Sequence, residues 1–371
     1  MLRLELSDCQ TFGIFSPPPS LKDDPAQISI GRLIEAHSNH VTFTSPSYFT
    51  TDELPSFKSI HSPLKHSRAE VKSWLKEQGA CQFAEAFKLE PDAQNKFLET
   101  GELLKAEIAS GSLKKGVPYS FRFANRAPSL QERAGILLAA LEQQEKTGGY
   151  LCGLWDDAGG LIVLTPEVLF ERSGETVETA ALAGTRLNPL GGLTPAEKEG
   201  VLTEWLNDPK EKAEHEWVVK GILDSLKPYG ELKVEPISIK ESGMLMHLET
   251  KISAFQVKAA SATLLQNLHP TPALGAFPRK PGLEWLLAEN KKLPRSKYGA
   301  PIGIFFPEEK IEIYLVAIRG IEWCQSPYFC QMGAGAGVVA QSKMTKEWVE
   351  VEAKWRSIAK SMNLTLDENP A

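Results

Sequence analysis

Hydrophobic residues recur at helical spacing between positions 342 and 362. Trp348, Val351 and Trp355 lie three or four residues apart, so one stripe of this helix is expected to pack inward, with Ser342 or Thr345 as its cap. Similar patterns predict helices over 68–78, 84–108 (as one helix or two), 129–146, 209–226, 260–268 and 282–289.

Short apolar runs bounded by turn residues predict strands, most densely after residue 149. The runs 149–155, 161–164 and 168–172 are separated by Gly, Asp and Pro, which is typical of antiparallel hairpins. Further strands are predicted over 179–186, 232–239, 303–306 and 312–323. No linker and no internal repeat interrupts this mixture of strands and helices, so we expect one large α+β domain built from intertwined halves.

Glycine and alanine alternate in the segment 333–337, next to the helix predicted at 342–362. Such a backbone can approach a ligand closely and can leave amide groups free to bind an anion. On the helix, Glu347, Glu350 and Lys354 lie on one face, and the two carboxylates are suited to a hard cation such as Mg²⁺. The alternative interpretation is a glycine-rich turn beside a solvated charged face.

Charge and cysteine content narrow the class of protein. The 371 residues carry a formal net charge of -6, which argues against a general nucleic-acid binder and favours a small-molecule partner. Five cysteines without a CxxC pair are typical of reduced thiols in a cytoplasmic protein. The charged first residues and the lack of any membrane-length apolar stretch favour a soluble, unexported chain.

A series of motifs in the last two thirds of the chain resembles the chorismate-utilising enzymes, the family of isochorismate, salicylate, anthranilate and aminodeoxychorismate synthases. They follow in the family's order at 181–186, 214–216, 246–248, 269–274, 298–303, Arg319, 335–338 and 347–350. The amino-terminal part resembles the family only loosely. We therefore expect a variable part of the fold at 1–105 and a chorismate-binding core at 106–371.

The resemblance implies two antiparallel sheets packed face to face and flanked by helices, with the site between them. It also implies Mg²⁺ held by Glu214 and Glu350, with Glu347 contributing directly or through water. A cation there would remove the repulsion between protein carboxylates and the ring carboxylate of chorismate.

The same resemblance assigns residues to the substrate. Arg319, Tyr298 and the backbone amides around Gly335 and Gly337 are expected to bind the enolpyruvyl carboxylate, with Lys354 completing a positive wall.

Four further residues are expected at the substrate, and Ala273 of the proline loop is one of them. Gly184 and Thr185 would bring backbone and hydroxyl against the ring, and His247 would donate toward the substrate or its ring carboxylate.

The residue that follows Gly111 by four positions indicates the reaction. Water-using members of the family resemble Gly-x-x-x-Lys here and ammonia-using members Gly-x-x-x-Gln, so Lys115 is identified with the general base and Glu167 with the general acid. The resemblance then implies water addition at C2 of chorismate and loss of the C4 hydroxyl, which gives isochorismate. Without the glutamine, no amidotransferase subunit is expected. Because Gly116 and Pro118 break the family's strand pattern, Lys114 remains a rival base.

Two alternatives stay open beside the isochorismate synthase. A salicylate synthase would go on to eliminate pyruvate, although Ala273 in the proline loop favours an enzyme that stops at isochorismate. A non-catalytic chorismate-binding homologue is the other. We expect a monomer, and the sequence leaves open whether the product feeds a quinone or a siderophore.

Overall fold

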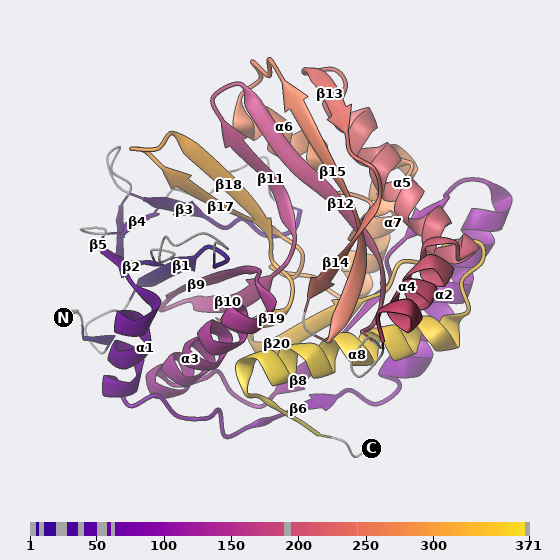
Figure 1. Ribbon diagram of the computed structural model, residues 1–371. Helices are drawn as coiled ribbons and strands as arrows, with labels where there is room; N and C mark the ends of the chain where they lie inside the picture. Colours follow the sequence, from indigo (N-terminus) through magenta and orange to yellow (C-terminus); the bar gives the residue numbers. More distant parts are fainter. Residues whose placement is uncertain are drawn as a thin grey trace.

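Two antiparallel sheets form the framework of the chain (Figure 1). The computed structural model describes residues 5–6, 11–19, 28–35, 41–49, 58–60, 64–188, 194–242 and 244–367. The first sheet runs in the order β6 (Ala86–Leu89), β8 (Tyr119–Ala124), β20 (Tyr328–Gly335), β19 (Gly320–Gln325), β10 (Gly159–Thr165), β9 (Tyr150–Asp156), β1 (Phe12–Ser16), β2 (Ile28–Glu35) and β5 (Leu64–His66).

The second sheet is joined to the first through β2. It runs in the order β4 (Lys58–Ile60), β3 (Thr42–Thr44), β17 (Pro301–Phe306), β18 (Ile311–Val316), β11 (Val168–Ser173), β12 (Thr176–Leu187) and β15 (Leu245–Phe255), with β13 (Glu231–Val234) and β14 (Ser238–Ser242) both on β15. Because β2 pairs with β1 on one side and β4 on the other, one strand belongs to both sheets. Two short pairings remain, β7 (Lys115–Gly116) with β16 (Ala276–Phe277) and β21 (Thr365–Leu366) parallel to β6.

The two sheets pack face to face, as expected. Phe15 and Val163 of the first sheet contribute to one buried apolar cluster with Phe43, Ile304 and Leu315 of the second. A mixed α+β architecture is therefore confirmed. The expected division at residue 105 falls inside a helix, and the variability of the part before it stays a prediction.

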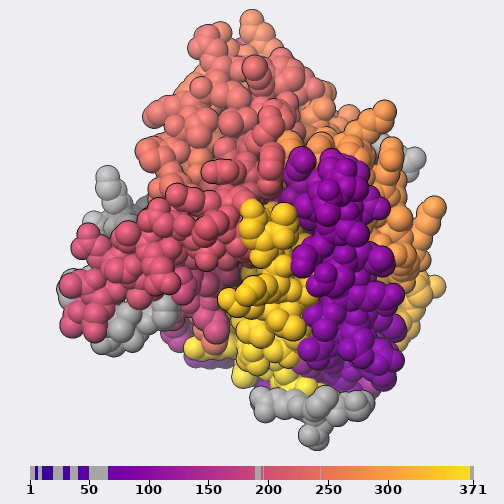
Figure 2. All heavy atoms as spheres, turned by 90° about the vertical axis from the view of Figure 1, so that its right-hand side faces the viewer, coloured from indigo at the N-terminus to yellow at the C-terminus, as the bar shows by residue number. Residues whose placement is uncertain are grey.

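Helices cover both sheets on the outside. Against the first sheet lie α1 (Arg68–Glu77), α2 (Ala93–Ser110), α3 (Leu130–Thr147) and α8 (Met344–Met362), and against the second lie α4 (Pro195–Leu206), α5 (Pro209–Leu226) and α6 (Ser261–Leu268). The remaining labelled helix, α7 (Arg279–Lys292), packs on β16, and its Trp285 contacts the apolar cluster of the first sheet. Figure 2 shows α2 and α8 side by side on one face. Among the described residues, no helix is both long and apolar enough to cross a membrane.

Several expected elements differ from those observed. The segment 84–108, expected to be wholly helical, contains β6 before α2, because residues 86–89 pair with β8 and β21. The single strand expected over 312–323 is broken before β19, where Arg319 adopts a φ of 58°. The strand expected over 232–239 is two strands separated by a segment containing Pro236, which has no N–H to donate.

The start of α8 also differs from the expectation. Neither Ser342 nor Thr345 caps it, because Lys343 occupies the N-cap position and makes no side-chain cap bond. The Ser342 hydroxyl instead accepts a hydrogen bond from the backbone N–H of Val339 at 3.1 Å. Ser342 therefore stabilises the chain that leads from the glycine-rich segment into the helix, and its side chain also hydrogen-bonds to Glu347 of α8.

Candidate active site

A small cavity lies where the ends of both sheets meet α5 and α8. Its volume is about 50 Å³, which is room for a few water molecules. Expected site residues that line it are Glu167, Thr185, Glu214, His247, Ala273, Tyr298, Arg319, Gly335, Gly337 and Lys354.

Lys115 lies just behind this lining and is completely buried. Its Nζ donates a 2.6 Å hydrogen bond to the carbonyl of Pro272 and is 3.6 Å from Glu214 Oε1. Burial, more than any neighbouring charge, lowers the pKa of Lys115 below its usual value.

The register of β7 decides which of the two neighbouring lysines faces inward. Lys115 pairs with Phe277, and Gly116 forms a bridge to Val338. The exposed Lys114 donates its backbone N–H to the carbonyl of Phe277. The pairing therefore buries the Lys115 side chain and leaves that of Lys114 in solvent.

Gly337 lets the glycine-rich segment approach two charged groups closely. A Cβ at this position would overlap Glu214 Oε1 and would come within 2.9 Å of Lys115 Nζ. A residue with a side chain would therefore have to push the Glu214 carboxylate aside.

The amides of this segment are less available to an anion than we expected. The N–H of Ala336 donates to the carbonyl of Pro118 and that of Val338 to the carbonyl of Gly116, at 3.2 and 2.8 Å. The carbonyl of Gly335 accepts a 2.7 Å hydrogen bond from Lys354 Nζ. Binding of a carboxylate by free amides is therefore limited here, because backbone pairing uses the amides on both sides of Gly337.

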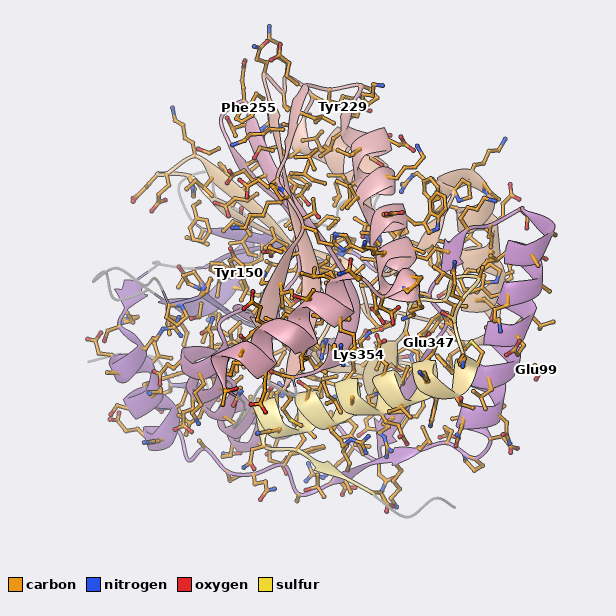
Figure 3. All side chains as sticks on the ribbon, turned by 45° about the vertical axis from the view of Figure 1, so that its right-hand side comes forward. Glu99, Tyr150, Tyr229, Phe255, Glu347 and Lys354 are labelled. Atoms are coloured by element: carbon orange, nitrogen blue, oxygen red, sulfur yellow. The ribbon has the colours of Figure 1, made fainter. Side chains whose placement is uncertain are left out.

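Glu214 projects from α5, and its carboxylate is ionised at neutral pH. Burial favours its protonation, but Lys210 and Lys115 outweigh burial and lower the pKa of Glu214 to about 2. On α8, Glu350 forms a 2.7 Å ion pair with Lys354, which is how Lys354 is held toward Gly335. Figure 3 shows Lys354 and Glu347 along the same helix.

The ammonium of Lys210, a residue the sequence interpretation missed, lies among three carboxylates. Its Nζ is 3.0 Å from Glu214 Oε2, 3.3 Å from Glu347 Oε2 and 3.4 Å from Glu211 Oε1. Burial opposes its charge, but these glutamates and Glu350 outweigh burial and raise the pKa of Lys210 well above its usual value. Burial in turn raises the pKa of Glu211 to about 8 and that of Glu347 to about 7.

The carboxylates suit a divalent cation in chemistry but not in their present spacing. Among the residues that the structure describes, no three acidic, histidine or cysteine side chains converge closely enough to hold a metal ion. However, Glu211 Oε2 is buried and has no hydrogen-bond partner among those residues. Carboxylate oxygens are the ligands that Mg²⁺ prefers, so the donor set fits this ion once the carboxylates draw together.

Glu167 lies in the turn between β10 and β11. Its backbone N–H donates to Thr165 Oγ1 at 3.2 Å, which holds the turn. Burial raises the pKa of Glu167 to about 7, although Lys115, Lys354 and Arg319 oppose the rise. A substantial fraction of this carboxyl group therefore carries a proton at neutral pH.

His247, Thr185 and Arg319 form a polar group at the opposite wall. His247 Nδ1 is 3.0 Å from Thr185 Oγ1, and its Nε2 is 3.5 Å from Arg319 Nη2. Burial and then the charge of Arg319 lower the pKa of His247 well below its usual value, so its ring is neutral. Because arginine can only donate, Nε2 is the acceptor and Nδ1 carries the proton. Donation from His247 to a substrate stays a prediction and requires the other tautomer.

Two further positions support the lining from behind. Gly184, at a φ of 77° in the bulge where the register of β12 shifts, leaves room for Glu211 Oε2. Arg295, which the sequence interpretation missed, is fully buried and donates to the carbonyls of Leu274 and Val117 at 2.8 and 3.0 Å. Its guanidinium lies 5.9 Å from the ring centre of Tyr298, so it helps to fix that part of the wall.

Comparison with known proteins gives the family. The model of the chorismate binding enzyme family matches residues 33–360, and the chain belongs to this family. The salicylate biosynthesis isochorismate synthase of Pseudomonas aeruginosa is 33% identical over 213 residues, 56% of this chain and 43% of that protein. Isochorismate synthase MenF of Pasteurella multocida is 31% identical over 196 residues, 51% of this chain and 44% of that protein. Each of these alignments covers less than half of the relative.

Solved structures share the fold over almost the whole chain. A putative 2,3-dihydroxybenzoate-specific isochorismate synthase, DhbC from Bacillus anthracis, superimposes with a TM-score of 0.74 at 21% identity, covering 97% of this chain and 99% of that one. MenF, the menaquinone-specific isochorismate synthase from Escherichia coli, gives 0.69 at 20% identity, with 96% and 90% covered. At such identities these likenesses establish the architecture.

Proposed function

We propose that this chain is an isochorismate synthase. The observation that carries the proposal is the burial of Lys115 and Glu167 beside one cavity, since Glu167 lines it and Lys115 lies directly behind Gly337 of its lining. Burial lowers the pKa of Lys115 and raises that of Glu167 to about 7, and Lys115 is the neighbouring charge that Glu167 feels most. Titratable groups whose environments move them in this way are suited to act as base and acid. Relatives named isochorismate synthases support the same conclusion.

The proposed reaction uses water as the nucleophile. Neutral Lys115 takes a proton from a water molecule, and the resulting hydroxide oxygen bonds to C2 of the chorismate ring. The ring double bonds shift, the bond from C4 to its hydroxyl breaks, and protonated Glu167 supplies the proton with which that oxygen leaves as water. One water is added and one is lost, so chorismate and isochorismate are isomers.

Substrate carboxylates would be held by the cationic part of the lining. Arg319 and Lys354 supply positive charge to the cavity, and Tyr298 also lines it. Since the amides beside Gly337 are paired with backbone carbonyls, we assign the larger share of carboxylate binding to these side chains.

We also propose Mg²⁺ as the cofactor. Glu214 and Glu350 would hold it, with Glu347 bound directly or through water. The ion would supply the positive charge that lets an acidic cluster accept the ring carboxylate. The gathering of Glu214 and Glu347 around the ammonium of Lys210 supports this proposal, because buried carboxylates need a positive charge beside them.

The remaining proposals concern partners and location. We propose a cytoplasmic monomer without an amidotransferase subunit, since Lys115 stands where the ammonia-using enzymes resemble Gly-x-x-x-Gln. Relatives include proteins named for salicylate biosynthesis and for menaquinone, so either kind of pathway would be served by the same product.

Separation of the products tests the proposal. Purified chain incubated with chorismate and Mg²⁺ should yield isochorismate alone. Salicylate with pyruvate would show a lyase, and retained chorismate binding without turnover would show a non-catalytic homologue.

A matched pair of lysine variants tests the base. Lys115→Ala should lower kcat by about 10²–10⁴-fold, the usual contribution of a positioned base, while Lys114→Ala should stay near the unmodified rate. Loss of activity in Lys114→Ala with full activity in Lys115→Ala would overturn the assignment.

A further inference from the structure

Lys210 connects two helices at the bottom of the proposed site. It lies in the first turn of α5, which Asp208 caps by accepting hydrogen bonds from the N–H groups of Lys210 and Glu211. Four residues along the same helix, Glu214 faces the same side as Lys210. The third partner, Glu347, comes from α8. The ammonium thus bridges α5 and α8 at the carboxylates assigned to the metal.

The side chain of Lys210 is nearly buried. Its exposed fraction is 16%, against 6% for Glu214 and 4% for Glu347. Lys210 is thus at the edge of the cluster, from where its flexible stem can reach solvent. Burial of several carboxylates without a cation would be costly, so in the metal-free chain this ammonium supplies the compensating charge.

We propose that Lys210 is a tethered counter-ion that occupies the cation position of the carboxylate cluster and has to leave it before a divalent metal ion can bind. This inference rests on the proposed function for the identity of the metal site. It assigns to a residue of the chain itself the role of setting metal affinity.

The distances explain why the two cations exclude each other. Lys210 Nζ is 3.0 and 3.3 Å from the nearest oxygens of Glu214 and Glu347, whereas Mg²⁺ binds oxygens at about 2.0–2.1 Å. The carboxylates must therefore close around a space that the ammonium now fills. The incoming Mg²⁺ ion brings two positive charges and displaces one. It therefore binds less tightly than it would to the same carboxylates without Lys210.

Glu211 provides a place for the exchange. Its Oε1 already contacts Lys210 at 3.4 Å, while its Oε2 is buried without a partner among the described residues. The displaced ammonium can stay near Glu211 while Glu214 and Glu350 hold the metal and Glu347 binds it directly or through water. The negative charge of the carboxylate cluster would then be balanced by a cation both with and without bound metal.

Metal titration without substrate tests this inference. Mg²⁺ added to Lys210→Met, followed by calorimetry, should bind at least about tenfold more tightly than to the unmodified chain, a difference of about 1.4 kcal/mol. Lys212→Met is the matched control, because Lys212 is exposed on the same helix and its loss removes the same charge. Its Mg²⁺ affinity should change by less than about twofold.

A second measurement keeps the test decisive if the Lys210→Met variant folds poorly. In the presence of a chelator, Lys210→Met should unfold at a lower temperature than the unmodified chain. Added Mg²⁺ should raise the unfolding midpoint of Lys210→Met by more than it raises that of the unmodified chain. Lys210→Arg keeps the charge and should not gain affinity. The inference is wrong if Lys210→Met binds Mg²⁺ equally or less tightly, or if neither chain binds it.

The outcomes separate this inference from the proposed function. Tighter Mg²⁺ binding by Lys210→Met with no turnover of chorismate by the unmodified chain would support the counter-ion and reject the synthase. Isochorismate formation with unchanged metal affinity in Lys210→Met would do the reverse.

Discussion

At the scale of single residues, burial rather than residue type gives the site its chemistry. Lys115 and Lys114 are adjacent and chemically identical, yet Lys115 is completely buried and Lys114 is exposed, and burial lowers the pKa of Lys115. The same holds for histidine: His215 uses both ring nitrogens, toward the carbonyl of Ala183 and the hydroxyl of Thr250, whereas His247 lines the cavity.

Glu167 leads to a prediction about pH. Its pKa of about 7 in the folded chain lies above the usual 4.5, so its contribution to stability is fully present below pH 4.5 and is lost as the pH rises through 7. Glu167→Gln removes this loss. From pH 5 to pH 8 the variant should lose less unfolding free energy than the unmodified chain, by up to about 3 kcal/mol. Urea unfolding at both pH values measures this difference.

The same variant tests the role of Glu167 as an acid. Its kcat should fall by about 10²–10⁴-fold, and the decline of kcat/KM above pH 7 should disappear. Glu178→Gln, exposed on β12, is the control and should change neither property. A Glu167→Gln chain with normal turnover and an unchanged alkaline limb would contradict the assignment.

The sequence carried part of this information. The charged and glycine residues at family positions predicted most of the cavity lining. The sequence could not decide between Lys114 and Lys115, because which of the two is buried depends on pairing with β16, more than 150 residues away. Lys210 could have been found, since Lys210, Glu211 and Glu214 share one helical face by their spacing.

At the scale of elements, amphipathic periodicity predicted the helices reliably. It did not predict the strands that form only by pairing with distant parts of the chain. The helix expected over 209–226 is α5 with the same bounds, and that over 129–146 differs from α3 by one residue at each end. In contrast, β6 exists because β8 and β21 pair with it, which no local pattern records. The break at Arg319 is likewise imposed by the chain's passage from one sheet to the other.

The start of α3 provides a prediction at this scale. Glu132 accepts hydrogen bonds from Arg126 at 2.6 and 2.7 Å and closes a capping box with Ser129. The bonds from Arg126, above all, lower the pKa of Glu132 to about 2. Its stabilising contribution is therefore present above pH 4.5 and is lost as the pH falls through 2.

Glu132→Gln should accordingly lower the unfolding free energy at pH 7 by about 1–2 kcal/mol, because the half-exposed Arg126 leaves the ion pair partly screened by solvent, with a smaller effect at lower pH. Chemical denaturation at pH 7 and pH 3 measures both values. Glu142→Gln, exposed on the same helix, serves as the control. An equal loss at both pH values would show that shape, and not charge, accounts for the effect.

At the scale of the whole molecule, the packing of the two sheets is the main structural constraint. Ile304 of β17 is 1% exposed within the cluster between the sheets. Ile304→Ala should lower the unfolding free energy by about 2–5 kcal/mol, because it leaves a cavity between two rigid layers.

Denaturant unfolding of this variant checks the estimate. Val349→Ala, at a side chain 52% exposed on α8, should stay within about 0.5 kcal/mol of the unmodified chain. A loss below about 1 kcal/mol in Ile304→Ala would mean that the sheets close over the vacated space.

The order of strands in the first sheet has a consequence for synthesis on the ribosome. β8 pairs with β20, whose first residue comes 209 positions after the first residue of β8 (328 minus 119). At about 5–20 residues per second, some 10–40 seconds separate the translation of the two strands. During that interval one edge of β8, with Tyr119, Phe121 and Phe123, has no strand beside it. The nascent chain is therefore a candidate for chaperone protection long after its amino-terminal helices have formed.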